Sequence, residues 1–508
     1  MRSIKLTYLL LSVAGMSLLL AMTFRYGAGI SPDSVGYIAV ARNVAAGRGM
    51  LTYSGEPMVM QPPLYPLLLA AGQMMFGMDP LNFSRVLNAI IFGLIIYFTG
   101  LYFSRSLENL LAFLGTLFVM ISPPLIMVSH MAWTEPLFIL CFVLSLYLLN
   151  DDPVVFGKMK LCLLAVLAAA ASCTRLIGIT IVPAYSLCIV MFDRGNRIKV
   201  RVLKALLFSG ISLVPISLWV VRTKWLTGTL FGPRGASSYT LGSNCSKMLD
   251  TILSWYLPDG LICSRYVLII LSLVAGIALG YAFAAQRFNW RKSLSACGPS
   301  VLFGCGYTGL LILTSTRTAY DPINYRLMSP VFIPLTFVIL IILREVLASF
   351  PRSAIVRYFL WLVAAFLFVE PLVATVHHVS KYREFGGYGY NSGKWGQSEL
   401  IGYLIRNQAH FAGRTIYSNI PDAVYILAGL PVKMAPSKHM YNSPDIANTL
   451  SNIKGTWPCE DSVFLVWFYN GGRSYVYSFD ELQKSSHLLT FAYLQDGSVS
   501  MVDRLTVE

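Results

Sequence analysis

The sequence predicts a polytopic α-helical membrane protein with a small α/β domain at its C-terminal end. Of its 508 residues, 56% are hydrophobic and only 12% are charged, about half the charged fraction of a typical soluble chain. Apolar segments recur along residues 1–378, and polar, Gly/Tyr-rich sequence begins at residue 379. We therefore predict a transmembrane domain over 1–378 and a separate C-terminal domain over 379–508.

About eleven transmembrane helices follow from the apolar segments, since a span needs ~17–25 mostly apolar residues. The segments are 6–24, 83–103, 108–128, 134–150, 157–173, 176–192, 205–225, 266–286, 298–315, 327–344 and 358–378. The pair 157–173 and 176–192 could instead be one long helix. One span there would turn every later basic loop outward, against the positive-inside tendency, so we predict two.

This arrangement places the N-terminus in the cytoplasm and the C-terminal domain outside the membrane. No small-residue cleavage site follows the first span, which predicts a retained helix rather than a removed signal peptide. Residues 64–77 are too short to cross, so we expect them at the interface or re-entering. The first outer loop then covers 25–82.

The formal net charge of +15 does not indicate nucleic-acid binding. The basic residues lie mostly in short clusters between apolar segments, which is the pattern of topology signals. Most of the cysteines lie in apolar segments and are expected to pack there. Cys245 and Cys263 share one loop, and whether they form a disulfide stays open.

In the C-terminal domain, short apolar runs at 414–418, 461–468 and 488–494 predict strands, and 421–430 has helical character. This alternation is typical of an α/β domain. Its aromatic residues have two interpretations, sugar-stacking platforms or core. They are Tyr388, Tyr390, Trp395 and Trp457. The domain as a whole either binds the acceptor or caps the bundle.

The first outer loop begins with Ser31-Pro32-Asp33-Ser34, the signature of a helix start. Serine is a good N-cap, proline suits the first helical position, and the helix dipole favours an ionised carboxylate in the first turn. Taken alone, Asp33 needs no role beyond stabilising this helix end.

Other ionisable residues are predicted at the same, outer ends of the spans. They are His130, Glu135, Arg175, Arg317 and Arg326. Each has an ordinary interpretation: Arg175 as a snorkelling side chain, Glu135 as a helix-start dipole partner, Arg326 as a headgroup ligand. Together they suit a substrate with an anionic head and a lipid tail, such as a polyprenyl-phosphate sugar. A carboxylate would deprotonate an acceptor hydroxyl, and cations would stabilise the departing phosphate.

Four motifs resemble the membrane-embedded GT-C glycosyltransferases, the superfamily of protein O-mannosyltransferases and aminoarabinose transferases. They are Asp33-Ser34-Val35-Gly36-Tyr37, Gln61-Pro62-Pro63-Leu64-Tyr65-Pro66, Thr134-Glu135-Pro136-Leu137-Phe138 and Arg326-Leu327-Met328-Ser329-Pro330. The resemblance implies a GT-C fold, a lipid-phosphate-linked donor and inverting transfer on the outer face of the membrane. We expect this to be a plasma membrane, because Leu505-Thr506-Val507-Glu508 is no endoplasmic-reticulum signal. The resemblance also implies Asp33 as the catalytic carboxylate. We expect the substrate to be bound by Tyr37, Gln61, Tyr65, Glu135 and Arg326, which lie in these motifs, and by His130, Arg175 and Arg317, which lie at the outer ends of the spans.

The chain departs from the family in ways that leave its substrate open. Met60-Gln61 stands where aminoarabinose transferases have Glu-Lys, and Asp33-Ser34 where protein mannosyltransferases have Asp-Glu. No Asp-x-Asp of the oligosaccharyltransferase kind is present, so we expect no obligatory metal, with a divalent cation as the alternative. The acceptor is a protein, lipid or polysaccharide. Two other functions remain: a glycan ligase or polymerase using a diphosphate donor, and a transporter or flippase.

Overall fold

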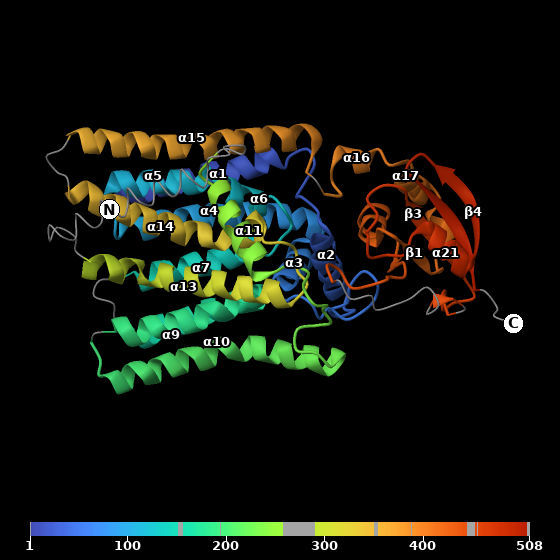
Figure 1. Ribbon diagram of the computed structural model, residues 1–508, viewed down its shortest axis with the longest axis horizontal. Coiled ribbons are helices and arrows are strands. Elements are labelled where there is room, and N and C mark those ends of the chain that lie inside the picture. Colours follow the sequence, from blue (N-terminus) through green and yellow to red (C-terminus); the bar gives the residue numbers. More distant parts are fainter. Residues whose placement is uncertain are drawn as a thin grey trace.

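The computed structural model has a helical bundle at one end and a smaller domain with a β-sheet at the other (Figure 1). It describes residues 2–150, 156–193, 195–257, 290–349, 354–387, 389–443, 453–454 and 456–504. The predicted span 266–286, Cys263 and Tyr388 lie outside these residues.

The bundle and the segments at its end consist of helices of very different lengths. In chain order they are α1 (Arg2–Met22), α2 (Pro32–Ala45), α3 (Leu64–Phe76), α4 (Pro80–Ser104), α5 (Asn109–Met120), α6 (Pro123–Ser129), α7 (Glu135–Leu149), α8 (Lys158–Thr174), η1 (Leu176–Thr180), α9 (Ile181–Phe192), α10 (Ile198–Thr227), α11 (Leu241–Ser254), α13 (Trp290–Arg317), α14 (Tyr325–Ser349) and α15 (Ala354–Phe385).

Six of the described helices are long and apolar enough to cross a membrane. A seventh span results if α5 and α6, which meet at a bend of 47°, are counted together. The predicted spans 134–150 and 176–192 correspond to apolar helices of fewer than 18 residues, Glu135–Leu149 and Leu176–Phe192. The protein is thus a multi-pass membrane protein, while the count of eleven spans stays a prediction.

The two ends of the bundle differ in character. Chain segments α2 and α3 lie at the end that faces the C-terminal domain, whereas the N-terminus lies at the opposite end (Figure 1). The basic connection between α9 and α10 is also at that opposite end. This separation agrees with the predicted cytoplasmic N-terminus, which stays a prediction.

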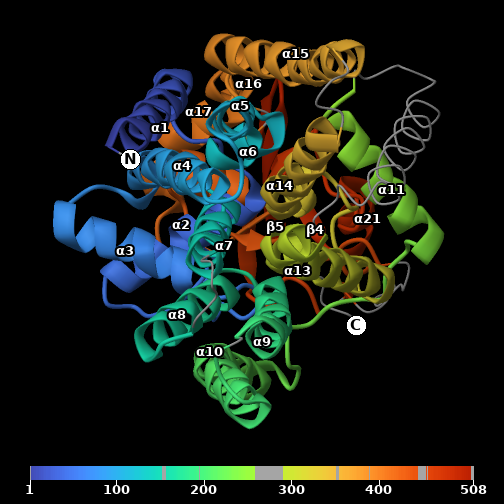
Figure 2. The ribbon, with the colours of Figure 1, turned by 90° about the vertical axis from the view of Figure 1, so that its left-hand side faces the viewer.

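Helix α3 is too short to span a bilayer. Its 13 residues extend for about 20 Å at 1.5 Å per residue, against a hydrocarbon core of about 30 Å. It lies on the outside of the bundle (Figure 2) and exposes Met74, Met75 and Phe76 near its C-terminal end. The length of α3 agrees with the prediction that residues 64–77 do not cross the membrane, and the choice between an interfacial and a re-entrant segment stays a prediction.

The C-terminal domain contains a five-stranded sheet with the order β2-β1-β3-β5-β4. Its elements are α16 (Gly393–Gly396), α17 (Glu399–Arg406), α18 (Gln408–Phe411), β1 (Ile416–Ser418), α19 (Pro421–Ala423), η2 (Val424–Ala428), β2 (Lys433–Met434), β3 (Ser462–Phe468), α21 (Phe479–Ser485), β4 (His487–Leu494) and β5 (Gly497–Asp503). Strand β1 is parallel to β2 and β3, with Ser418 opposite Met434 and Val466. Strands β3, β5 and β4 are antiparallel. The predicted α/β domain is confirmed.

Alternate residues of β3 enter two separate cores, as expected for a strand buried on both faces. Phe464 and Val466 pack with α17 and with Val424 of η2. Val463 and Leu465 pack on the other face, with residues that include Trp457. Of the tail aromatics, Trp457 and Tyr390 are therefore buried side chains of the core, and Trp395 is partly buried against Tyr390.

Candidate active site

Asp33 occupies the position in α2 that its sequence predicts. Ser31 is the N-cap, Pro32 begins the helix, and Ser31 and Ser34 form a capping box. The Ser31 hydroxyl also accepts a hydrogen bond of 2.7 Å from the indole N–H of Trp133. The start of α2 is thereby tied to the segment that leads into α7.

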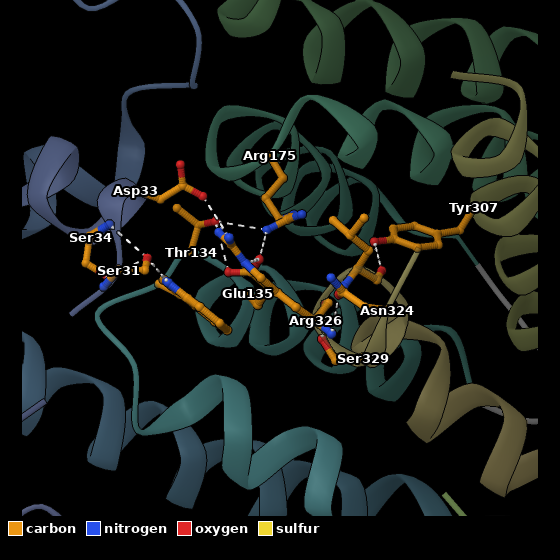
Figure 3. Close-up of polar contacts among 12 residues, drawn as sticks. Ser31, Asp33, Ser34, Thr134, Glu135, Arg175, Tyr307, Asn324, Arg326 and Ser329 are labelled. Carbon is orange, nitrogen blue, oxygen red and sulfur yellow. Dashed lines mark hydrogen bonds and ion pairs between the residues drawn. The ribbon is translucent and has the colours of Figure 1, made fainter. Parts of the chain in front are cut away.

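Asp33 belongs to a chain of ion pairs that joins four distant parts of the sequence (Figure 3). Its Oδ2 lies 2.7 Å from Nη1 of Arg326, at the start of α14. The Nε of Arg326 lies 2.6 Å from Oε1 of Glu135, the first residue of α7. The same oxygen of Glu135 pairs with Arg175, which ends α8. Arg175 also donates to the hydroxyl of Thr134, at 3.2 Å.

The two carboxylates of this cluster differ in their access to solvent. The Asp33 side chain is 37% exposed, whereas that of Glu135 is completely buried. Arg326 and Arg175 are 11% and 14% exposed. Asp33 is therefore the carboxylate that a ligand can reach, and Glu135 holds the two guanidinium groups in position.

The backbone and the neighbouring rings fix Arg326. Asn324 caps α14 by accepting from the backbone N–H groups of Arg326 and Leu327, at 2.9 and 3.2 Å. The guanidinium carbon of Arg326 lies 4.1 Å from the ring centroid of Trp133, a favourable cation–π distance. Arg326 is thus held by charge on one side and by an aromatic face on another.

A cavity of about 320 Å³ lies beside the start of α14. Asn324 and Tyr325 line it from one side, and Lys247 and Asp250 of α11 from another. Asn324 and Tyr325 come just before Arg326 in the sequence, but Arg326 and the other members of the ion-pair cluster are not among the residues that line this cavity.

Two tyrosines that the sequence analysis singled out form a supporting layer. Tyr37 and Tyr65 are buried, and their rings meet edge-on with centroids 5.7 Å apart. The Tyr65 hydroxyl donates to Asn88 at 3.2 Å. Burial, and next the charge of Asp33, raise the pKa of Tyr37 above its usual value. Tyr37 therefore stays neutral and packs beneath the cluster rather than acting as a base.

Three further predicted site residues lie neither in the ion-pair cluster nor in the layer of Tyr37 and Tyr65. The ring of His130 is buried against His378 and Tyr382, and its Nδ1 bonds to the Ile126 carbonyl. Gln61 lies in the loop before α3, and Arg317 is exposed at the end of α13. Within the described ranges, no ion pair involves Arg317. None of the contacts described for His130, Gln61 and Arg317 reaches the ion-pair cluster, so their binding roles stay predictions.

Sequence reasoning missed Trp133, Thr134 and Asn324 as parts of the site. Thr134 directly precedes Glu135, whereas Trp133 and Asn324 stand two residues before Glu135 and Arg326, respectively. Their position at helix starts was the available signal, because a residue just before a helix is often placed to cap it.

The cluster carries two carboxylates and two guanidinium groups, so its formal charges balance. Among the residues that the structure describes, no group of three or more His, Cys, Asp or Glu side chains could hold a metal ion. The cluster places a guanidinium group, which suits an anionic group such as phosphate, directly beside an accessible carboxylate.

No protein-family model matches this chain, and no curated protein resembles it closely in sequence. Solved structures do match. ArnT from Cupriavidus metallidurans bound to undecaprenyl phosphate has a TM-score of 0.61 at 13% identity, over 97% of both chains. An oligosaccharyltransferase of Archaeoglobus fulgidus, in complex with Zn and sulfate, has a TM-score of 0.54 at 11% identity, over 90% of this chain and 68% of that one. The mycobacterial arabinofuranosyltransferase AftD has a TM-score of 0.51 at 12% identity, over 98% and 41%.

All three similar structures are membrane glycosyltransferases of the GT-C type. At these identities the likeness is one of fold, and it extends over almost the whole chain in the case of ArnT. The resemblance that the four motifs indicated is confirmed at this level: the chain has the GT-C fold of membrane-embedded glycosyltransferases.

Proposed function

We propose that this protein transfers a sugar from a polyprenyl-phosphate-linked donor to an acceptor hydroxyl. The observation that carries the proposal is the ion pair between the solvent-accessible Asp33 and Arg326, whose Oδ2 and Nη1 atoms lie 2.7 Å apart. The buried carboxylate of Glu135 holds Arg326 from the other side. A carboxylate and a cation side by side are what an acceptor hydroxyl and a donor phosphate require. The fold, shared with a protein solved with undecaprenyl phosphate, supports this choice of donor.

In the proposed reaction, Asp33 takes the proton of the acceptor hydroxyl. The oxygen then attacks the anomeric carbon of the sugar, and the bond to the phosphate oxygen breaks on the opposite face, which inverts the configuration. Arg326, with Arg175 behind it, stabilises the two negative charges of the departing lipid phosphate. The guanidinium of Arg326 has five N–H donors, so it can bind phosphate while Nε keeps its contact with Glu135.

We place this reaction on the extracytoplasmic side of a plasma membrane. The cluster lies at starts and ends of helices, on α2, α7, α8 and α14, and α2 is at the end of the bundle that faces the C-terminal domain (Figure 1). The basic connection between α9 and α10 is at the opposite end, which by the positive-inside tendency is cytoplasmic. The acceptor would then approach from the side of the C-terminal domain.

The Asp33→Asn variant tests the role of the base. Asn keeps the shape of the side chain but cannot accept the proton, and loss of general-base catalysis typically lowers rates by ~10²–10⁴-fold. Transfer from a labelled polyprenyl-phosphate sugar should fall accordingly in purified protein, with undecaprenyl-phosphate binding retained. Glu56→Gln is the matched control, because Glu56 is an exposed carboxylate on the same outer loop.

Full activity of Asp33→Asn would contradict the assignment of the base. Running the assay with both a monophosphate-linked and a diphosphate-linked sugar separates the proposed function from that of a ligase or polymerase. We expect transfer from the monophosphate only.

Metal independence is a second prediction of the proposal. The guanidinium groups of Arg326 and Arg175 already offset the carboxylates, so the cluster has no net charge to attract a divalent cation. Transfer should be unchanged by EDTA and unaffected by added Mg²⁺ or Mn²⁺. A loss of activity in EDTA that added metal restores would show that cation binding is required after all.

A further inference from the structure

The C-terminal domain has a cavity of its own, away from the Asp33 cluster. Its volume is about 300 Å³, at the lower end of the ~300–1,000 Å³ that is typical of small-ligand sites. The residues that line it include Asn419, Trp467, Gly472, Arg473 and Ser474. Lys438 and Tyr477 complete its polar and aromatic wall.

The cavity lies where the topology of the sheet favours a binding site. Asn419 directly follows β1, and Trp467 is at the carboxyl end of β3. Strand β1 lies between β2 and β3 and is parallel to both. The chain passes from β1 to β2 on one side, while β3 lies on the other, so the strand order reverses between β1 and β3.

The two connections also run on opposite faces of the sheet. The segment after β1 packs through Val424 with Val466, and the segment before β3 packs through Trp457 with Val463. A crevice at the carboxyl ends of parallel strands, where the order reverses, is the general ligand position in open α/β sheets.

Each cation of the cavity already has a carboxylate partner. Arg473 pairs with the buried Asp422, and Nζ of Lys438 lies 2.7 Å from Oε2 of Glu481. An anionic ligand would have to compete with these carboxylates. The hydroxyls of Ser474 and Ser478 in the lining can both donate and accept hydrogen bonds, which suits neutral hydroxyl groups.

The remaining lining adds an aromatic face and free polar groups. Trp467 is partly exposed, and its ring contacts Phe479 edge-on. In the described part of the chain, neither its indole N–H nor the Ser474 hydroxyl has a hydrogen-bond partner. Gly471 has a φ of +83°, and a Cβ on Gly472 would lie 3.4 Å from the Asn419 amide. Gly471 thus has a backbone conformation that favours glycine, and Gly472 brings the backbone to the wall of the cavity.

We propose that this cavity binds a neutral saccharide unit. A sugar ring has an apolar face of C–H groups that can stack on Trp467, and its hydroxyls can bond to Arg473 and to the hydroxyls of Ser474 and Ser478 in the lining. The volume fits one or two sugar units rather than a long glycan. The proposal concerns binding by the C-terminal domain and stands whether or not the bundle transfers sugar.

The test uses the full-length protein in nanodiscs and saturation-transfer NMR. The probes are methyl mannoside, methyl glucoside, methyl galactoside, maltose and mannobiose, with glucose 6-phosphate as the anionic comparison. We expect millimolar binding of at least one neutral probe, with the strongest transfer to the ring protons of one face. Glucose 6-phosphate should bind more weakly than the matching neutral sugar.

Two substitutions locate the binding. Trp467→Ala removes the stacking face, and Ser474→Phe fills the mouth of the cavity from an exposed position that does not disturb the core. Both should abolish the signal. Tyr493→Ala is the control, because Tyr493 is a 75% exposed aromatic residue on the edge strand β4 of the same domain.

Three outcomes would overturn the proposal. They are no signal from any neutral probe with the wild-type protein, tighter binding of glucose 6-phosphate than of the neutral sugars, and an undiminished signal in Ser474→Phe. Because Ser474 is on the surface, the last result stands even where Trp467→Ala fails to fold.

Discussion

Asp33 and Glu135 show how burial gives the same functional group two different roles. Both are acidic residues in the first turn of a helix, where the dipole favours a negative charge. Asp33 remains accessible, whereas Glu135 is completely buried between Arg326 and Arg175. Access, not residue type, decides which of them can take part in chemistry.

Replacing Glu135 with Gln should therefore destabilise the protein. The change leaves two largely buried guanidinium groups without their shared carboxylate, and breaking a buried pair typically costs ~3–5 kcal/mol. Asp33→Asn is the matched comparison, since removing an exposed partner costs about 0–1 kcal/mol. Thermal unfolding in detergent measures both. Equal unfolding temperatures for Glu135→Gln and the wild type would show that Glu135 is not the anchor.

At the level of elements, the start of α2 is held by more than its own cap. The Ser31 hydroxyl accepts from the backbone of Ser34, at 3.4 Å, and from Trp133, at 2.7 Å. The ring of Trp133 in turn covers the guanidinium of Arg326. The cap thus links the helix that carries Asp33 to the cation beside it.

Ser31→Ala should consequently reduce transfer more than it reduces stability. Loss of a serine N-cap typically costs ~1 kcal/mol, but a small displacement of a catalytic group can lower a rate by up to ~10²-fold. Thr240→Ala, which removes the side-chain cap of α11, is the control for cap loss elsewhere. The transfer rate and the unfolding temperature of both variants are measured in parallel. If Ser31→Ala transfers sugar as fast as Thr240→Ala, the Ser31 cap does not position Asp33 beside Arg326.

On the scale of the whole molecule, a small set of hydrogen bonds fastens the C-terminal domain to the bundle. Asn391 accepts from the backbone N–H of Ile30 at 3.3 Å and donates to the Tyr26 carbonyl at 3.1 Å. It also donates to the Tyr382 hydroxyl, at 2.8 Å. A Cβ on Gly389 would lie 1.9 Å from the Ile30 carbonyl oxygen. The segment after α15 thus packs directly against the residues that precede Asp33.

Asn391→Ala should loosen this attachment. Three hydrogen bonds are lost, and the partners left behind include backbone groups that cost ~1–3 kcal/mol each when buried and unpaired. We expect faster cleavage between α15 and α17 in limited proteolysis. Asn407→Ala is the control, because it removes a hydrogen bond inside the C-terminal domain and should leave the cleavage rate unchanged. If Asn391→Ala is cleaved no faster than Asn407→Ala, Asn391 does not fasten the two domains.

The sequence alone was sufficient for the features that depend on local pattern. Hydrophobic length identified the spans of the six long helices, and the turn chemistry of Ser31-Pro32-Asp33 located the start of α2. Strands β1, β3 and β4 follow from apolar runs. Strand β5 was missed because it alternates Ser498, Val499 and Ser500 and carries too few apolar residues to be recognised, although all three are buried in the structure.

Tertiary structure alone decided which polar residues meet. Asp33, Glu135, Arg175 and Arg326 lie on four helices, and their ion pairs depend on how those helices pack. The same packing left Arg317 exposed and buried His130 against other rings. Sequence determines where each helix starts and what charge it carries there, because those are local properties. Distance and burial between residues far apart in the chain arise only when the helices assemble.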